Sequence, residues 1–192
     1  MVTQSSARKK DPFDIGAKHQ VVQDTTGIHN KHQQILSTAL YVNDERDCQR
    51  IMNLAVDVFG ELGPKQIKRA RMHCTLVVGM RDVLSSLERN MFGKCHDMII
   101  YGYTKPNAPV QALLVRCPDT IPSSSTLTHI TVATAKNVSW IEEIHTVLES
   151  GIVENLPEQK CLTVRGRMGA IVCLQKRQTE QKLYKRRFKD VH

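Results

Sequence analysis

Short runs of β-branched and apolar residues, each bounded by turn-forming residues, constrain this fold more than any other feature of the sequence. The runs lie at 35–42, 72–80, 97–103, 110–115, 128–135, 161–164 and 168–174. Runs of this length and composition are typical of β-strands. Apolar residues recur instead with the period of an amphipathic helix at 44–62 and 138–148. The sequence therefore predicts an α+β domain in which strands outnumber helices.

Turn-forming residues predict how these elements connect. Residues 104–109, which contain two prolines and an asparagine, are expected to join the runs at 97–103 and 110–115 as a hairpin. Arg165-Gly166-Arg167 is expected to be the turn between the last two strands, and Gly63-Pro64 is expected to end the first helix. A short polar helix is predicted between Arg81 and Phe92.

Charge divides the chain into three parts. Residues 1–33 are polar and predict a flexible arm, residues 34–175 predict one domain, and residues 176–192 form a basic tail. The formal net charge is +8, of which the tail carries +5, so the domain itself is nearly neutral. A basic tail is typical of chains that bind nucleic acid. A solvated tail without a partner is the alternative.

Several classes of protein are not expected. The sequence has no run of about 18 apolar residues, so it predicts no membrane anchor. The first residues contain no apolar core of a secretory signal, so the predicted location is the cytoplasm or the nucleus. None of the six cysteines forms a CxxC pair, and Cys95-His96 has no second pair at zinc-like spacing. We therefore expect no metal site and no cofactor.

Two copies of a His-x-Thr pattern lie in strand-like runs: His73-Cys74-Thr75 and His129-Ile130-Thr131. Side chains two residues apart on a strand share a face. Each motif would therefore present an imidazole beside a hydroxyl, while Cys74 and Ile130 would face the opposite layer. A histidine at a strand edge is the commoner meaning of either motif taken alone. Two such strands side by side would gather both motifs at one spot.

That arrangement suits the hydrolysis of a phosphodiester. An imidazole titrates near neutral pH, so one histidine can take a proton from water while the other gives a proton to the leaving oxygen. Threonine hydroxyls can donate hydrogen bonds to the non-bridging phosphate oxygens, where charge gathers in the transition state. The candidate catalytic residues are His73, His129, Thr75 and Thr131.

The paired motifs and their surroundings resemble the 2H phosphoesterase superfamily. The resemblance covers about residues 35–175 and is greatest to the 2′,3′-cyclic-nucleotide 3′-phosphodiesterases and the cyclic phosphodiesterase domains of tRNA ligases. It includes LSTALYVNDERDCQRIMNLAVDVFGEL, MHCTLVVG, DMIIYGYTKPNAPVQALLV, THITVATAKNVSWIEEIHTVLE and GRMGAIVCL. His129 follows His73 by 56 positions, which is short for the family and implies trimmed loops.

The resemblance implies a two-lobed, pseudo-symmetric fold with antiparallel sheets around a central cleft and helices outside. It implies that the four motif residues line that cleft. It also implies a metal-independent 2′,3′-cyclic phosphodiesterase that converts cyclic phosphates of nucleotides or RNA 3′ ends to 2′-phosphates. Two alternatives stay open: a 2′,5′-oligoadenylate phosphodiesterase, and a non-catalytic RNA-binding module of the same fold.

Four further residues are candidates for binding the substrate. Tyr101 and Tyr103 lie two apart in a predicted strand and are expected to share a face, where one could stack on a base. Packing in the core is the alternative for both tyrosines. Arg165 and Arg167 flank the predicted glycine turn and could contact an RNA backbone.

Overall fold

A computed structural model describes residues 19–23, 33–60, 66–68, 72–124, 127–135, 147–148, 150 and 153–174. Its strands are β1 (His19–Val22), β2 (Gln33–Tyr41), β3 (Gln66–Lys68), β4 (His73–Arg81), β5 (Cys95–Thr104), β6 (Val110–Arg116), β7 (His129–Ala135), β8 (Val153–Asn155) and β9 (Leu162–Leu174). Its helices are α1 (Glu45–Phe59), α2 (Ser86–Met91) and a single 3-10 turn, η2 (Glu158–Lys160). Within these ranges the α+β prediction is confirmed.

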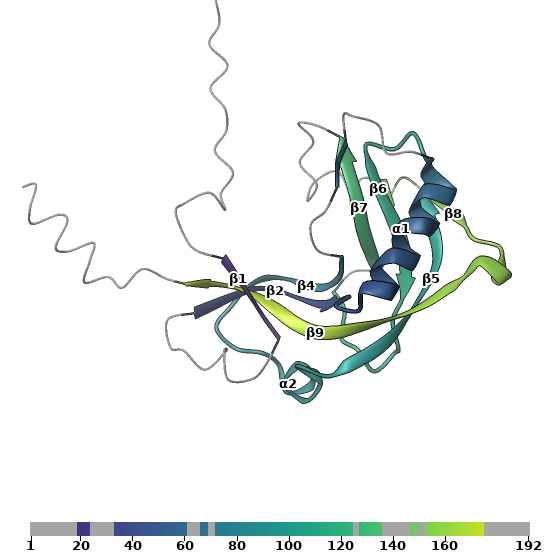
Figure 1. The fold of residues 1–192 in the computed structure, drawn as a ribbon. Coiled ribbons are helices and arrows are strands. Elements are labelled where there is room, and N and C mark those ends of the chain that lie inside the picture. The colour runs from purple at the N-terminus through teal and green to yellow at the C-terminus, as the bar shows by residue number, and fades with distance from the viewer. Residues whose placement is uncertain are drawn as a thin grey trace, which may run out of the picture.

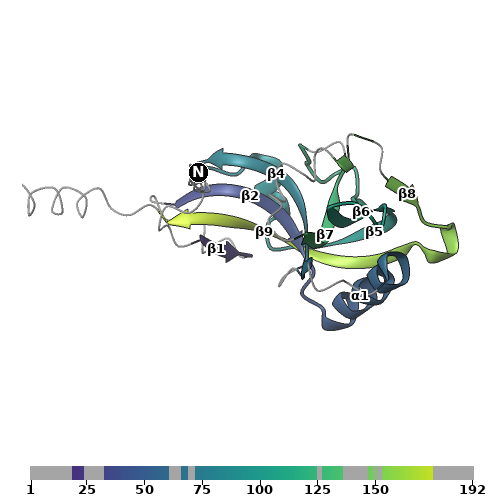
Figure 2. The same ribbon diagram turned by 90° about the horizontal axis from the view of Figure 1, so that it is seen from above.

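The strands form one antiparallel sheet that closes on itself. Neighbours in the sheet run β9-β2-β4-β7-β6-β5, and β5 pairs with β9 again, which completes a barrel. The long strand β9 takes part in both halves of the molecule, beside β2 at one end and beside β5 at the other (Figures 1 and 2). Strands β1, β3 and β8 extend the sheet from β9, β7 and β5.

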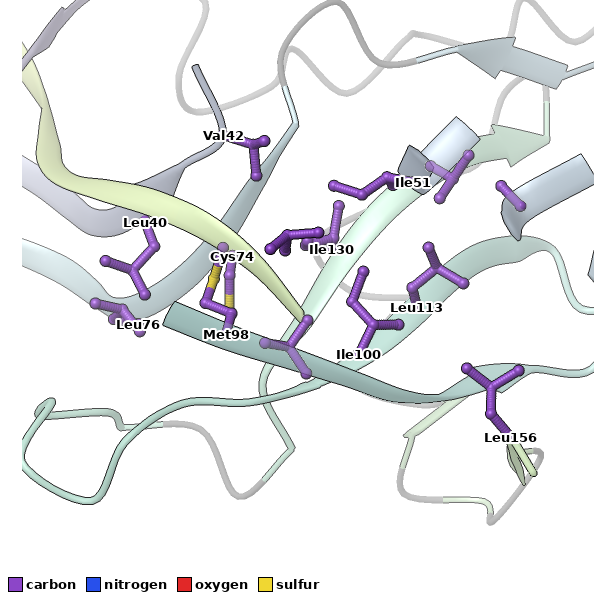
Figure 3. Packing of buried hydrophobic residues seen from close by; sticks show 14 of the residues in the cluster. Leu40, Val42, Ile51, Cys74, Leu76, Met98, Ile100, Leu113, Ile130 and Leu156 are labelled. Carbon is purple, nitrogen blue, oxygen red and sulfur yellow. The ribbon is translucent and has the colours of Figure 1, made fainter. Parts of the chain in front are cut away.

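The barrel interior is the main hydrophobic core. Inward-facing residues of six strands meet there with one side of α1, which contributes Ile51, Ala55 and Phe59. Figure 3 shows Cys74 and Ile130 among these packed side chains. Helix α1 begins where the Asp44 carboxylate accepts hydrogen bonds from two backbone N–H groups, an N-cap that satisfies donors the helix cannot pair itself. Core burial therefore fixes both the barrel and the helix.

A second hydrophobic cluster packs α2 against the part of the sheet formed by β1, β2 and β9. Ile35, Ala170 and Val172 from the sheet pack there against Leu84 and Phe92, which flank α2. The helix opens with a capping box between Ser85 and Glu88, so the short helix predicted between Arg81 and Phe92 is confirmed.

The prediction of a turn at Arg165-Gly166-Arg167 is wrong, because these residues lie inside the continuous strand β9. A Cβ at Gly166 would come 2.7 Å from Met98 Cε and 2.8 Å from Leu40 Cβ. The glycine therefore permits close packing of β9 over the core and does not reverse the chain. A glycine between two arginines looks the same in the sequence whether it forms a turn or permits close packing within a strand.

Other differences concern the ends of elements. Helix α1 ends earlier than predicted, where Gly60 adopts a φ of 75°. Strand β1 lies inside the stretch predicted as a flexible arm, and β8 was not anticipated. Of the helix predicted over 138–148, only Val147 and Leu148 are described, and both are buried in helical conformation. The rest of that segment, the remainder of the predicted arm and the basic tail lie outside the described residues.

The topology is that of a closed barrel in a single sheet, and it does not show the two-lobed pseudo-symmetry that the resemblance implies. In the described part of the chain, neither α-helix combines the length and the apolar character needed to cross a membrane.

Candidate active site

The two His-x-Thr motifs lie on neighbouring strands. Strands β4 and β7 are antiparallel partners, and the pair that joins them is Cys74 with Ile130, the central residues of the two motifs. In an antiparallel register the residues on either side of this pair also face each other across the strands. This geometry would set His73 near Thr131 and Thr75 near His129.

The two faces of this junction differ in burial. Cys74 and Ile130 have no exposed surface and point into the barrel core. Alternation along each strand then directs the four histidine and threonine side chains to the other face. His129 is 9% exposed there, and His73, Thr75 and Thr131 are half-buried. The structure thus brings together all four predicted catalytic residues in one block of two histidines and two threonines.

His73 is held by an aromatic neighbour that sequence reasoning missed. Tyr41 is opposite His73 on β2, and the two rings stack with centroids 5.4 Å apart and planes 27° apart. On the other side of Tyr41, a Cβ at Gly169 would come 3.1 Å from the tyrosine ring. The glycine therefore leaves room for the ring that orients His73. No local pattern marks this role of Tyr41, because it depends on the register of three strands.

His129 is oriented by a hydrogen bond to the backbone. Its Nδ1 lies 3.3 Å from the carbonyl oxygen of Leu127. A carbonyl oxygen only accepts, so Nδ1 carries a proton and a neutral imidazole has its lone pair on Nε2. The preceding residue is also fixed, because the Thr128 hydroxyl donates to the carbonyl of Val115 on β6. These bonds hold the start of β7 in place beside β6.

The two candidate arginines lie in one strand but in different surroundings. Arg167 is exposed and is opposite Tyr41 on β2, so its side chain leaves the sheet on the same face as Tyr41 and His73. Arg165 is also exposed, but its guanidinium donates to the Asp97 carboxylate at 3.1 Å. That hydrogen bond raises the pKa of Arg165. Arg167 is the arginine aligned with the motifs.

The prediction that Tyr101 and Tyr103 share a face is wrong. A β-bulge between Ile100 and Gly102 inserts Tyr101 as an extra residue, which reverses the alternation of side chains beyond it. Tyr103 packs against the main core, and its hydroxyl donates to Glu154 at 2.7 Å. Tyr101 packs on the outer side of β6 with Leu114, the residue opposite His129. Only Tyr101 lies on the face of the motifs.

Two hollows are bordered by other candidate residues. One of about 570 Å³ is bordered by both arginines and by the start of α1. The other, of about 350 Å³, is bordered by Tyr101, Arg116, Asp119 and Thr128. The four motif residues are in neither lining. Within the described ranges, no group of three or more His, Cys, Asp or Glu side chains is arranged to hold a metal ion.

A comparison with protein-family models finds no match for this chain, and a comparison with curated proteins finds no significant match. Inferences about chemistry therefore rest on the motif residues and their geometry.

Proposed function

We propose that this chain is a metal-independent phosphodiesterase that hydrolyses the 2′,3′-cyclic phosphates of nucleotides or RNA 3′ ends to 2′-phosphates. The observation that carries the proposal is the Cys74–Ile130 pairing, which sets two imidazoles and two hydroxyls together on one face of β4 and β7. Acid and base groups that serve one phosphorus atom must lie on the same surface, within reach of the attacking and leaving oxygens.

The proposed reaction is a single displacement at phosphorus. A water oxygen forms the new P–O bond while the bond from phosphorus to the ribose 3′ oxygen breaks. One histidine accepts the proton that water loses, and the other donates a proton to the 3′ oxygen. The site returns to its starting state when the two imidazoles exchange these protons with solvent. Two histidines in opposite protonation states meet this need and ask for no metal ion.

The surroundings favour His129 as the base and His73 as the acid. The Leu127 carbonyl holds the neutral His129 ring with its lone pair on Nε2, the atom that would accept a proton from water. His73 stacks on the Tyr41 ring, and the negative face of an aromatic ring stabilises a neighbouring cation. The protonated form of His73 is therefore the form that its partner favours.

The remaining residues of the face would stabilise the negative charge of the transition state. Thr75 and Thr131 each stand opposite a histidine, so their hydroxyls can donate to the non-bridging phosphate oxygens. Arg167 lies in the same cross-strand row as Tyr41 and His73, two strands from the nearer histidine. A guanidinium at that place can contact the phosphate of a preceding nucleotide. Arg165, engaged with Asp97, is a weaker candidate.

We also propose that the fold belongs to the 2H phosphoesterase superfamily, with the two-lobed architecture of that family. What supports this is the adjacency of the two motifs and the direction of their side chains. Its RNA substrates would also meet the basic tail at residues 176–192, which carries most of the net charge.

The decisive experiment is turnover of 2′,3′-cyclic AMP with product analysis. We expect a nucleoside 2′-phosphate as product, activity that survives excess EDTA, and a bell-shaped dependence of kcat on pH, because one histidine must be neutral and the other protonated. A 3′-phosphate product, or activity lost to EDTA and restored by zinc or magnesium, would contradict the mechanism. Parallel assays with 2′,5′-linked oligoadenylate and with RNA binding alone distinguish the two alternative functions.

A further inference from the structure

We propose that the hollow beside Arg116 is the subsite for the nucleobase, and that it selects a base with an exocyclic amine over uracil. The inference rests on the proposed function, because it assigns a binding place to the base of the cyclic nucleotide whose phosphate binds at the histidines. The hollow has a volume of about 350 Å³, within the range of small-molecule sites. Its lining is made by the end of β6, the loop that follows β6, Tyr101 and Thr128.

The position of the hollow relative to the histidines suits one nucleotide. His129 is opposite Leu114 on β6, and Arg116 is two residues further along the same strand. Strand geometry puts the Cα atoms of Arg116 and His129 about 8 Å apart, from ~3.4 Å per residue along a strand and ~4.8 Å between strands. Thr128, which lines the hollow, directly precedes His129, so the hollow borders the start of β7, although the Thr128 side chain turns toward Val115. A phosphate at His129 would therefore hold its own base near Arg116.

Tyr101 and Arg116 together form a stacking surface. The Arg116 guanidinium carbon lies 5.1 Å from the centre of the Tyr101 ring, a cation–π contact. Tyr101 is half-buried against the outer apolar cluster of β6, whereas Arg116 is exposed. The guanidinium plane is thus the accessible layer, and the tyrosine behind it fixes its orientation. Single-stranded bases stack readily on arginine planes of this kind.

Asp119 supplies the selectivity. It is exposed and lines the same hollow as Arg116. An ionised carboxylate only accepts hydrogen bonds, so it favours bases that carry an amino group: adenine at N6, cytosine at N4 and guanine at N2. Uracil has no amino group and offers only its N3–H as a donor, between two carbonyl oxygens that a carboxylate repels, so its contact with Asp119 is weaker. The hollow therefore predicts weaker binding of uridine nucleotides.

The chain offers a matched control on the same strand. Tyr103 is two residues from Tyr101, but the β-bulge turns it to the core side, where its hydroxyl is bonded to Glu154. Removing that hydroxyl with Tyr103→Phe should leave base recognition unchanged. Arg116→Lys is the test variant for stacking, because it keeps the positive charge and removes the planar stacking surface.

The experiment measures two quantities on the full chain: hydrolysis of the four 2′,3′-cyclic nucleotides, and calorimetric binding of the four nucleoside 2′-monophosphates. We expect the wild type to prefer amine-bearing bases over uracil by about fivefold or more, the effect of one good base contact. Arg116→Lys should weaken the binding of every base by about fivefold or more, as loss of stacking does. Asp119→Asn should bring the ratio between adenosine and uridine nucleotides close to one.

The two readouts separate the subsite from the proposed function. The subsite would be overturned, and the phosphodiesterase would stand, if hydrolysis is normal but the wild type binds all four bases with the same affinity. The same conclusion would follow if Asp119→Asn and Arg116→Lys both leave the wild-type base preference and affinity unchanged. Base-selective binding that these variants remove, without any hydrolysis, would support the subsite and reject the enzyme. Absence of both hydrolysis and nucleotide binding would overturn both.

Discussion

The two faces of the β4–β7 junction are formed by alternating residues of the same strands, but one face packs in the core and the other carries the candidate site. Cys74 and Ile130 face inward and have no exposed surface, so they contribute to stability through apolar packing. The histidines and threonines on either side of them face outward and form the candidate site. Because both sets of side chains are attached to the same pair of strands, the backbone pairing sets the distance between the candidate catalytic groups. Inward changes should therefore affect unfolding, and outward changes should affect rate.

The largest expected effect is on the outer face. His73→Ala or His129→Ala should lower kcat on 2′,3′-cyclic AMP by about 10²- to 10⁴-fold, since each removes a proton transfer. The unfolding transition should stay cooperative, although His129→Ala should lower the free energy of unfolding more than His73→Ala, because the His129 side chain is only 9% exposed. Steady-state kinetics and urea unfolding on the same preparations measure the two quantities.

Near-wild-type turnover in either histidine variant, with the cooperative unfolding transition intact, would remove the basis of the proposed mechanism. If both variants instead lose stability, and lose activity only because less protein is folded, the imidazoles are structural.

The sequence predicted which residues of each His-x-Thr motif share a face better than it predicted how the strands are arranged. The faces of His73 and His129 follow from alternation along a strand, which is local and needs no knowledge of partners. Their adjacency was a hypothesis, since nothing local specifies which strands pair. The stack of Tyr41 on His73 and the closure of the barrel through β9 depend on long-range register, and a propensity pattern carries no information about register.

Two errors show where local signals mislead. Gly166 was assigned to a turn, although its role is to let β9 approach Met98 and Leu40 closely. The pair Tyr101 and Tyr103 was assigned to one face by simple alternation, which the bulge at Gly102 breaks. Both glycines lie where a Cβ would meet atoms closer than 3.0 Å, so tertiary contact explains their presence. Only a structure distinguishes such a glycine from a turn glycine.

The second prediction contrasts a buried charge with an exposed one. Glu88 is 1% exposed and accepts two hydrogen bonds from the Arg81 guanidinium, at 2.7 and 2.8 Å. Burial alone would raise the Glu88 pKa, but these bonds and those from Ser85 and Thr38 outweigh burial and hold the pKa at about 2. Glu88→Gln should lower the free energy of unfolding by about 3 kcal/mol, since it removes the buried carboxylate that pairs with the partly buried Arg81 guanidinium.

The pH dependence of this effect follows from the direction of the shift. A carboxyl whose pKa is held below its ordinary value of 4.5 stabilises the fold fully above about pH 4.5, and that stabilisation is lost as the pH falls toward 2. The wild type and Glu88→Gln should therefore differ by a constant amount at neutral pH and converge in acid. Asp97→Asn, which breaks the exposed pair with Arg165, is the control and should change the free energy of unfolding little, because solvent screens an exposed pair. If Glu88→Gln and Asp97→Asn lower the free energy of unfolding equally, the buried pair is no more important for stability than the exposed pair.

A third, smaller effect is expected where β9 crosses the core. Gly166→Ala should destabilise the protein by about 1–3 kcal/mol, because the new methyl group would overlap Met98 and Leu40 unless both shift. Thermal unfolding measures the loss. The double variant Gly166→Ala with Met98→Ala provides the check, since shortening the flexible Met98 side chain removes one of the two overlaps. A neutral or stabilising Gly166→Ala would show that the close approach of β9 to Met98 and Leu40 does not require a glycine.

The smallest expected effect tests the inner face at the centre of the junction. Ile130→Val removes one methylene from a fully buried side chain and should lower the free energy of unfolding by about 0.5–1.5 kcal/mol. The Cys74–Ile130 backbone pairing should persist, so kcat per folded molecule should stay within about twofold of wild type if the pairing, rather than tight packing, positions His129. Steady-state kinetics well below the unfolding temperature measure kcat, and ligand binding gives the concentration of folded protein. A much larger fall in kcat would mean that the single methylene transmits core packing directly to the imidazole, and that the two faces of the junction are not separable.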